Sequence, residues 1–519
     1  MPMALLGRIE EESEKEGIVP YSMHVSSKYL DLTKKKLELT RLPREVELGE
    51  GRRWALGTPK SVLEGVLDYW LEHYDWRSQE THLNTALPQF RTTVTLLSSS
   101  TSAPSSRPST STSRRLRIHF VHKRSKHANA IPLLFCHTWP SSFLEAQKII
   151  DALTDPQEVM GYGAGAQLAF HVVVPSIPGF GFSDAAGWEE FGVEETARAF
   201  DAVMGRLGYE RYVTHGSGWG FSICRALALN HPEHCVAVHT ANPTFAEPTF
   251  KRSPLAFLKY RVAKLTKARF SLLSFGYVPS ELEKPPGTRL ENPATAYDLL
   301  FCEGRPNPEL ARLYSHRPQT LAFSLCDSPI GLLAGLLDAI RTRAPAQSPV
   351  TSRSRSPFLS PSELELQDAH SAPDMEMQSA VQRGEPVSPR QSEANASHYT
   401  WSATEVLNWT MLQWLPGPEA GLRWLRRAHF DSAPTSPLST SYCSVPLGIS
   451  SFRARNSHGS STPVMWGSAW SHVGWVKRHQ RPASLPAWEA PDLLVLDMRE
   501  CFGTFLSHGK LPNLPTRAT

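Results

Sequence analysis

The sequence lacks a strong excess of charge of either sign. Its 54 Lys and Arg stand against 50 Asp and Glu, which leaves a formal net charge of +4 on 519 residues. Nucleic-acid-binding proteins draw much of their affinity from concentrated positive charge that neutralises phosphates. We therefore expect no nucleic-acid partner.

Cysteines and long apolar runs are also scarce. The seven cysteines are odd in number and none are paired at C-x-x-C spacing, so we expect no disulfide framework, no metal and no cofactor. No run reaches the ~18 apolar residues of a membrane helix, and the acidic residues 10–16 do not suit a signal peptide. The sequence thus predicts a cytoplasmic protein without a transmembrane segment. Peripheral membrane association stays open.

Two tracts contain too few apolar residues to form a core. Ser98 to Ser113 consists of Ser, Thr and Pro apart from Ala103 and Arg107, and residues 341–397 hold Ser-Pro steps and charges with almost no aromatic residues. Such segments bury too little apolar surface to offset the entropy of ordering them. We predict that both are disordered insertions.

Elsewhere the hydrophobic pattern has regular periods. Residues 30–42 and 61–74 have helical spacing, 116–122 alternates like an edge strand, and 131–136 reads as a buried strand. From Phe170 to Thr240, short apolar runs alternate with helices. This order predicts an α/β protein with a mostly parallel sheet.

The later part of the chain predicts a lid and a return to the sheet. Residues 296–337 and 404–427 are rich in Leu and Trp at helical spacing, too long for a connection within a sheet. Residues 444–446 and 463–466 are expected to be late strands, and 493–505 a final helix.

A glycine-rich turn at residues 216–220 is the most informative local feature. In a nucleophile elbow, the tip residue projects over the sheet because its flanks have no room for a Cβ. The flanks Gly216 and Gly220 put Gly218 at the tip, where it offers no side chain. Ser217 lies one position early and should point toward the packing side. It is a weak alternative nucleophile.

Eight stretches outside the two tracts contain motifs that occur together, in this order, in one enzyme family. They are Leu37 to Pro43, Trp54 to Pro59, Tyr69 to Asn84, Pro132 to Phe143, Val174 to Ser183, Pro232 to Cys235, Arg317-Pro318 and Asp327 to Leu332. These motifs resemble the microsomal-type epoxide hydrolases, an α/β-hydrolase family with an N-terminal meander, and especially fungal members associated with secondary metabolism. The resemblance covers most of the chain outside the two tracts.

The resemblance implies the following domains. A meander would span 1–95, a Ser/Thr/Pro-rich insertion 96–115 and the first half of the hydrolase core 116–250. A helical cap would span 251–430 with the insertion 341–397, and the rest of the core 431–519.

The family opens an epoxide through an ester formed on an elbow carboxylate, which a histidine-activated water hydrolyses while cap tyrosines donate to the leaving oxygen. By resemblance, Gly218 occupies the nucleophile position and Ser484 the base position. Tyr314 matches one cap donor, and the second falls on Leu425. The position of the family's acidic partner of the histidine falls on residues 452–455, which contain no carboxylate. The oxyanion turn and substrate contacts fall on His137, Thr138, Trp139, Pro140 and Trp219.

Some of these assignments have structural alternatives. Thr138 replaces a glycine, which is costly if the position needs a positive φ. Tyr314 could be a packed lid residue, and Trp139, Trp219 and Trp424 could line a pocket or only fill a core. His479 could replace the lost base, but a surface position is the preferred interpretation.

Three functional hypotheses follow. The chain could be an enzyme acting on an epoxide of a small apolar metabolite, a binding or scaffold protein that has lost catalysis, or a cyclase-like protein that uses Tyr314. Composition shifts near several departures also fit missed or retained introns, although Gly218 lies within the regular stretch from Glu194 to Thr244.

Overall fold

The computed structural model describes residues 17–49, 53–97, 113–156, 168–282, 316–341, 399–433, 435–453, 463–509 and 511. The predicted insertions at 98–113 and 341–397 lie outside these ranges except at their first or last residues. Ser113 begins a strand, and Arg341 ends a helix.

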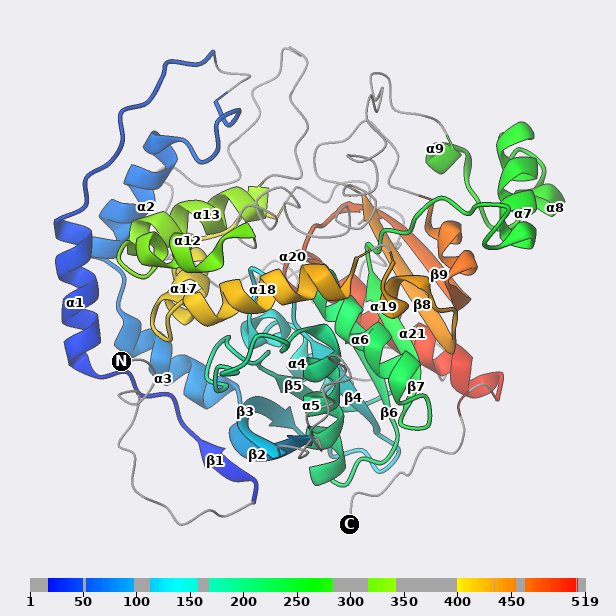
Figure 1. The fold of residues 1–519 in the computed structure, drawn as a ribbon, viewed down its shortest axis with the longest axis horizontal. Helices are drawn as coiled ribbons and strands as arrows, with labels where there is room; N and C mark the ends of the chain where they lie inside the picture. The colour runs from blue at the N-terminus through cyan, green and yellow to red at the C-terminus, as the bar shows by residue number, and fades with distance from the viewer. Residues whose placement is uncertain are drawn as a thin grey trace, which may run out of the picture.

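A nine-stranded sheet forms the centre of the molecule (Figure 1). Its order is β1-β2-β3-β5-β4-β6-β7-β8-β9. The strands are β1 Val19–Tyr21, β2 Gln89–Leu97, β3 Ser113–Lys123, β4 Ile131–Cys136, β5 Phe170–Pro175, β6 Tyr212–Gly216, β7 Cys235–Ala241, β8 Cys443–Arg453 and β9 Ser471–Pro482. From β5 to β9 all neighbours run parallel, while β1, β2 and β3 pair antiparallel. The mostly parallel sheet predicted from the alternating pattern is therefore present.

The first part of the sheet corrects one prediction. Residues 116–122 lie in β3, which pairs with β2 on one side and with β5 on the other. They do not form an edge strand. The alternation arises because one face of β3 is exposed near its start, and an exposed face gives the same pattern in an interior antiparallel strand as in an edge strand.

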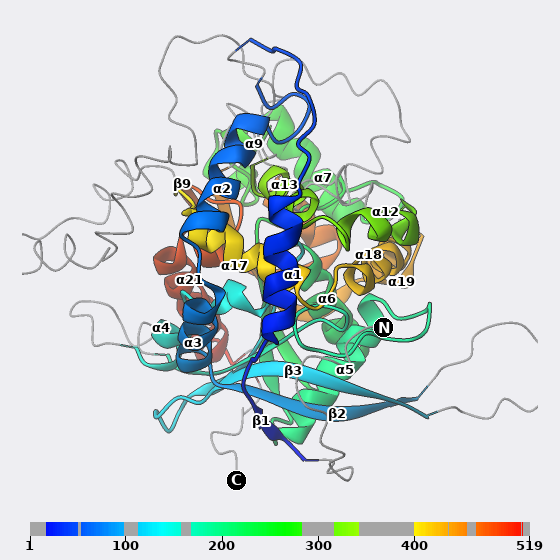
Figure 2. The ribbon, with the colours of Figure 1, turned by 90° about the vertical axis from the view of Figure 1, so that its left-hand side faces the viewer.

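Helices cover both faces of the sheet. In the N-terminal part they are α1 Ser27–Glu38, α2 Lys60–Glu72 and α3 Trp76–Ala86; Figure 2 shows them on one side of the molecule. The core helices are α4 Ile150–Thr154, α5 Val193–Arg206, α6 Trp219–Asn230, α20 Pro486–Glu489 and α21 Pro491–Ser507. Two short 3-10 helices are η2 Phe143–Ala146 and η4 Val464–Ala469.

The predicted lid region is helical where the structure describes it. Between residues 251 and 431 the described helices are α7 Pro254–Leu265, α8 Ser271–Ser274, α9 Pro279–Leu282, α12 Pro318–Leu325, α13 Pro329–Arg341, α17 Ala403–Trp414 and α18 Glu419–Asp431, and the short α19 Pro437–Thr440 follows them. Residues 283–315, which include the first part of the helical stretch predicted at 296–337, lie outside the described residues. The domain boundaries stay predictions.

Two hydrophobic clusters flank the sheet. One joins α2, α17, α20 and α21 and contains Trp401, Trp409 and Trp488, whose ring centroids lie 4.9 to 5.7 Å apart. The other joins α5, α6 and α18. Because both faces of the central strands are covered, β4 and β5 read as uninterrupted apolar runs.

One predicted strand is wrong. Residues 463–466 begin the 3-10 helix η4, in which the Trp466 amide donates to the Pro463 carbonyl oxygen at 3.0 Å. A run of four apolar residues carries no reliable period, so it cannot distinguish a buried strand from a helical turn. The other late strand is longer than predicted, because β8 extends to Arg453.

None of the described helices is by itself long and apolar enough to cross a membrane. The pair formed by Pro318–Leu325 and Pro329–Ile340 meets that length and composition only together, across a bend of 115°.

Candidate active site at the turn between β6 and α6

The turn that ends β6 leaves no room for side chains at its flanks. A Cβ on Gly216 would lie 2.5 Å from the Gly220 carbonyl carbon, and a Cβ on Gly220 would lie 2.0 Å from the Cys136 carbonyl oxygen. Between them, Gly218 has φ 53° and ψ −121°, a conformation that residues with a side chain rarely adopt. The chain therefore makes a sharp turn that glycine adopts without strain, with Gly218 at its tip.

Gly218 borders a small hollow of about 90 Å³. Typical ligand pockets measure ~300–1,000 Å³, so this hollow suits only a small group. Its lining is mainly apolar and comprises Gly218, Phe221, Ser222, Arg225, Pro243, Thr244, Phe245, Ala246, Ser432, Leu438, Ser439 and Trp470.

Ser217 does not border this hollow. Its side chain is buried, and its hydroxyl donates a long hydrogen bond of 3.5 Å to Oε1 of Glu145. A serine nucleophile is activated by an adjacent base, usually an imidazole. The hydroxyl of Ser217 instead points toward a buried carboxyl group.

Thr138 closes the turn from the neighbouring strand. It follows β4, and its Oγ1 accepts a hydrogen bond from the backbone N–H of Trp219 at 3.1 Å. Its own N–H donates to Oε2 of Glu145 at 3.0 Å. The backbone of Thr138 does not have a positive φ. The backbone strain expected from replacing glycine therefore does not arise.

Glu145 is a site residue that the sequence reasoning missed. It is buried in η2 directly beneath the turn, where burial raises its pKa to about 7, and hydrogen bonds from the Thr138 amide and the Ser141 and Ser217 hydroxyls oppose that rise. A carboxyl group of this kind is partly protonated near neutral pH. The available signal was a single acid inside the otherwise apolar Phe143-Leu144-Glu145-Ala146.

His137 holds two loops together. Its Nε2 accepts a hydrogen bond from the Ile177 amide at 3.0 Å, and burial lowers its pKa to about 4. The imidazole is therefore neutral at pH 7. After it, the Pro140 carbonyl oxygen accepts from Nε2 of Gln413 at 2.6 Å, and Trp139 borders a narrow crevice of about 20 Å³.

The ring of Trp219 belongs to the core. It makes edge-to-face contacts with Trp424, at 5.7 Å between ring centroids, and with His429, at 5.0 Å. These contacts pack α6 against α18. Trp424 in turn donates to the Thr196 hydroxyl at 2.9 Å and borders an outer groove of about 1010 Å³ that does not include Gly218.

Ser484 follows β9 and is held by its backbone. Its N–H donates to Oε2 of Glu489 at 2.5 Å. Its buried Oγ has no hydrogen-bond partner among the described residues. A hydroxyl has no basicity near neutral pH, so Ser484 offers no base at this position.

His479 is buried, so the preferred surface position is wrong. Its Nε2 lies 2.6 Å from Oδ2 of Asp497 on α21, and its ring stacks on Phe452 at 4.6 Å between centroids. The charged neighbours Lys477 and Arg478 suggested a surface segment. The β9 strand instead turns His479 toward α21, because successive side chains of a strand point to opposite faces.

The His479–Asp497 pair extends into a buried polar chain beneath the sheet. Asp497 accepts from the Ser450 hydroxyl at 2.5 Å, Ser450 contacts His239 at 3.0 Å, and the Nδ1 atoms of His239 and His215 lie 2.9 Å apart. Burial lowers the pKa of His215 to about 3. Oδ2 of Asp497, Ser450 and the histidines bond to one another, and Oδ1 of Asp497 lies 3.4 Å from Nζ of Lys477. These internal contacts favour a structural role.

The cap donors are only partly described. Tyr314 lies outside the described residues. Leu425, at the second donor position, is fully buried in α18 and is unable to donate a hydrogen bond. Phe452 is buried and Arg453 exposed, while residues 454 and 455 lie outside the described residues.

Comparisons with known proteins find two matching families. The family described as "Epoxide hydrolase N terminus" matches residues 18–146, and the one described as "alpha/beta hydrolase fold" matches residues 131–291. Together they span the N-terminal helices, the elbow and the start of the lid region.

Curated proteins with similar sequences are also named as epoxide hydrolases. A "Putative epoxide hydrolase" of Stigmatella aurantiaca is 31% identical over 322 residues, which cover 62% of this chain and 60% of the relative. "Epoxide hydrolase 1" of Sus scrofa is 30% identical over 336 residues, which cover 64% of this chain and 63% of the relative. The matches thus span less than two thirds of either relative.

Solved structures share the fold. The juvenile hormone epoxide hydrolase of the silkworm Bombyx mori superposes with a TM-score of 0.62 at 22% identity, covering 97% of this chain and 98% of that one. The epoxide hydrolase of Aspergillus niger gives 0.59 at 20% identity, covering 95% and 97%. The predicted α/β-hydrolase fold is confirmed. In its N-terminal part and hydrolase core, the chain is similar in sequence to epoxide hydrolases of the microsomal type.

Proposed function

We propose that this chain binds an epoxide or a related electrophile of a small apolar metabolite, such as a secondary metabolite, without forming the covalent ester of the family. The observation that carries the proposal is the residue at the tip of the elbow. Gly218 has no side chain, so no carboxylate is available there to attack a ring carbon. Losing a nucleophile typically lowers turnover by several orders of magnitude.

The chain also lacks the base that the family uses for the second step, hydrolysis of the ester. Hydrolysis of an ester intermediate needs a base that activates water, and Ser484 supplies a buried hydroxyl. His479 does not replace it in this arrangement, because it does not line the hollow beside Gly218 and its ring is buried against Phe452 between β9 and α21.

The amide after the elbow is already occupied. Backbone N–H groups at this point stabilise developing negative charge when they are free to donate. The N–H of Trp219 donates to the Thr138 hydroxyl instead. A neutral ligand would meet an apolar hollow there, whereas an oxyanion would have to displace an internal hydrogen bond.

Incubation with styrene oxide tests the proposal. Intact mass spectrometry of the full chain should show no covalent addition, and product analysis should show no diol above the uncatalysed rate. Equilibrium binding of the epoxide should be detectable through the fluorescence of Trp470, which lines the hollow. A trapped ester, or diol in quantity, would overturn the proposal.

The same incubation tests a cyclase-like function of Tyr314 when the epoxide probe contains its own nucleophile. Ring products from an epoxy alcohol, absent with a Tyr314→Phe variant, would assign that role. Donors that polarise an epoxide could close a ring without an acid at position 218.

We also propose a cytoplasmic location with peripheral attachment to membranes. From Lys251 to Ser280 the chain carries seven basic and no acidic residues. Exposed apolar side chains lie among them: Leu255, Leu258, Leu265, Phe270 and Leu272. Figure 1 shows α7 and α8 standing away from the sheet. Apolar side chains framed by Lys and Arg suit the surface of an anionic bilayer.

Sedimentation with vesicles tests the attachment. The chain should bind vesicles containing phosphatidylserine more strongly than pure phosphatidylcholine vesicles, and Leu265→Ser with Leu272→Ser should weaken that binding. Equal behaviour of the variant and the wild type would contradict the attachment.

A further inference from the structure

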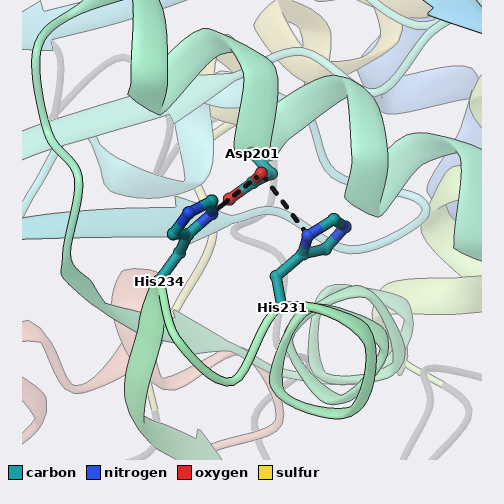
Figure 3. A group of neighbouring side chains, drawn as sticks. All are labelled: Asp201, His231 and His234. Carbon is teal, nitrogen blue, oxygen red and sulfur yellow. Dashed lines mark hydrogen bonds and ion pairs between the residues drawn. The ribbon is translucent and has the colours of Figure 1, made fainter.

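Three potential metal ligands lie close together at the amino ends of two central strands, on the opposite side of the sheet's length from the elbow (Figure 3). Asp201 lies on α5, His231 ends α6, and His234 precedes β7. This corner lies at the amino ends of β6 and β7, whereas Gly218 follows the carboxyl end of β6. The cluster is therefore separate from the candidate active site.

The spacing of the ligand atoms suits a metal ion. Nδ1 of His234 lies 2.9 Å from Oδ1 and 3.1 Å from Oδ2 of Asp201, and Nδ1 of His231 lies 3.6 Å from Oδ2. One ligand atom from each residue lies within 4.8 Å of the others. Zinc ligands at about 2.0–2.1 Å in a tetrahedron stand about 3.3 Å apart. The separations of 3.1 Å and 3.6 Å to Oδ2 of Asp201 are already close to that value.

A simple ion pair accounts for His234 but not for His231. His234 makes a normal hydrogen bond to Asp201. The distance of 3.6 Å from His231 to the same carboxylate exceeds that of a hydrogen bond. Nδ1 of His231 thus faces the Asp201 carboxylate without a hydrogen bond to it, and a metal ion between the two would bind both atoms.

The surroundings hold the ligands in place. The Tyr212 hydroxyl donates to Oδ1 of Asp201 at 2.7 Å. The backbone N–H of Tyr212 donates to the His234 carbonyl oxygen at 2.9 Å, and the His234 N–H donates to the His231 carbonyl oxygen at 3.1 Å. Such supporting hydrogen bonds orient metal ligands and raise affinity. The carboxylate of Glu233, 3.8 Å from Nδ1 of His231, is exposed and close enough to join.

We propose that Asp201, His231 and His234 bind a divalent transition metal, with Zn²⁺ the best match, and with Glu233 or water in the fourth position. Two imidazoles and a carboxylate form a common zinc ligand set. The ion would clamp α5 to the turn between α6 and β7. The cysteine spacing predicted no metal, but this site uses histidines three residues apart and an acid thirty positions earlier.

Metal titration of the full chain tests the site. After treatment with EDTA and its removal, calorimetry with ZnCl₂ should show one ion bound per chain, and CoCl₂ should give the visible absorption of tetrahedral cobalt. His231→Gln and Asp201→Asn should abolish the cobalt spectrum. Tyr212→Phe, which keeps all the ligands, should weaken zinc binding about 10- to 100-fold.

A matched control distinguishes this site from surface binding. His127 forms an exposed ion pair with Asp155 at 3.1 Å, so His127→Gln removes a comparable pair and should leave zinc binding unchanged. Circular dichroism establishes that each variant folds. Absence of stoichiometric binding by the wild type, or equal binding by folded His231→Gln, would overturn the proposal. Epoxide binding is not part of the readout, so the two proposals fail separately.

Discussion

The backbone N–H of Trp219 donates a hydrogen bond to the hydroxyl of Thr138 at 3.1 Å. This bond joins the turn after β4 to the first residue of α6, beside Gly218. Under our proposal, it uses internally the amide that would otherwise face a developing negative charge. Thr138 therefore stabilises the turn while reducing its ability to act on a substrate.

Removing the Thr138 hydroxyl should destabilise the protein. Thr138→Val keeps the branched shape but leaves the buried Trp219 N–H without its acceptor, which should cost about 1–3 kcal/mol. Thr138→Ser retains the hydroxyl and should cost less. Urea unfolding of both variants measures the difference. Equal stabilities would mean that this hydrogen bond contributes nothing.

A carboxylate at the elbow should restore only the first step. In Gly218→Asp, attack on styrene oxide would open the ring and leave a hydroxyalkyl ester, so the intact mass should rise by one molecule of the epoxide. Release should be absent, because Ser484 provides no base. The positive φ should also lower stability by about 1–3 kcal/mol.

Two further variants bracket this result. Gly208 also has a positive φ, and a Cβ there would meet open space, so Gly208→Asp adds the same charge without an ester. Gly218→Asp with Ser484→His should begin to release diol. Sustained diol production by Gly218→Asp alone would contradict the assigned loss of the base.

Glu145 should make stability fall as the pH rises. Burial raises its pKa to about 7, so between about pH 4.5 and 7 the folded state holds a proton that the unfolded state has released. Glu145→Gln lacks this penalty. Relative to the wild type, it should gain stability on the order of 2 kcal/mol between pH 5 and pH 8. Urea unfolding at both pH values checks this, and a constant difference would refute it.

His137 should act in the opposite direction. Burial lowers its pKa to about 4. Between about pH 6.5 and pH 4, the histidine is therefore protonated in the unfolded state but neutral in the folded state. Its contribution is complete above pH 6.5 and is lost as the pH falls toward 4. His137→Gln should flatten the acid limb of the stability profile. A wild-type slope in the acid limb of His137→Gln would disprove the assignment.

Local rules succeeded where one residue or one uninterrupted run decides the outcome. The apolar runs at Ile131 and Phe170 became β4 and β5, since strands covered on both faces need apolar residues at every position. The spacing of Gly216 and Gly220 indicated a turn that excludes side chains, and the fold agrees, because a Cβ on either glycine would collide with neighbouring backbone atoms.

Local rules failed where partners far along the chain decide. Residues 463–466 form the first turn of the 3-10 helix η4, which directly precedes β9. The strand β3 lies inside the sheet because β2 pairs with one of its sides and β5 with the other. The environment of Glu145 in η2 depends on Thr138 and Ser217, which follow the strands β4 and β6.

The sequence by itself determined the α/β-hydrolase fold, the mostly parallel sheet and the absence of a side chain at Gly218, because motifs, periodicity and glycine spacing lie within short segments. Only the tertiary structure decided that Thr138 binds the Trp219 amide, that His479 is buried against Asp497, and that Asp201 meets His231 and His234. Each of these contacts joins separate elements of the fold. Their existence depends on how the helices pack on the sheet, and no local pattern encodes that packing.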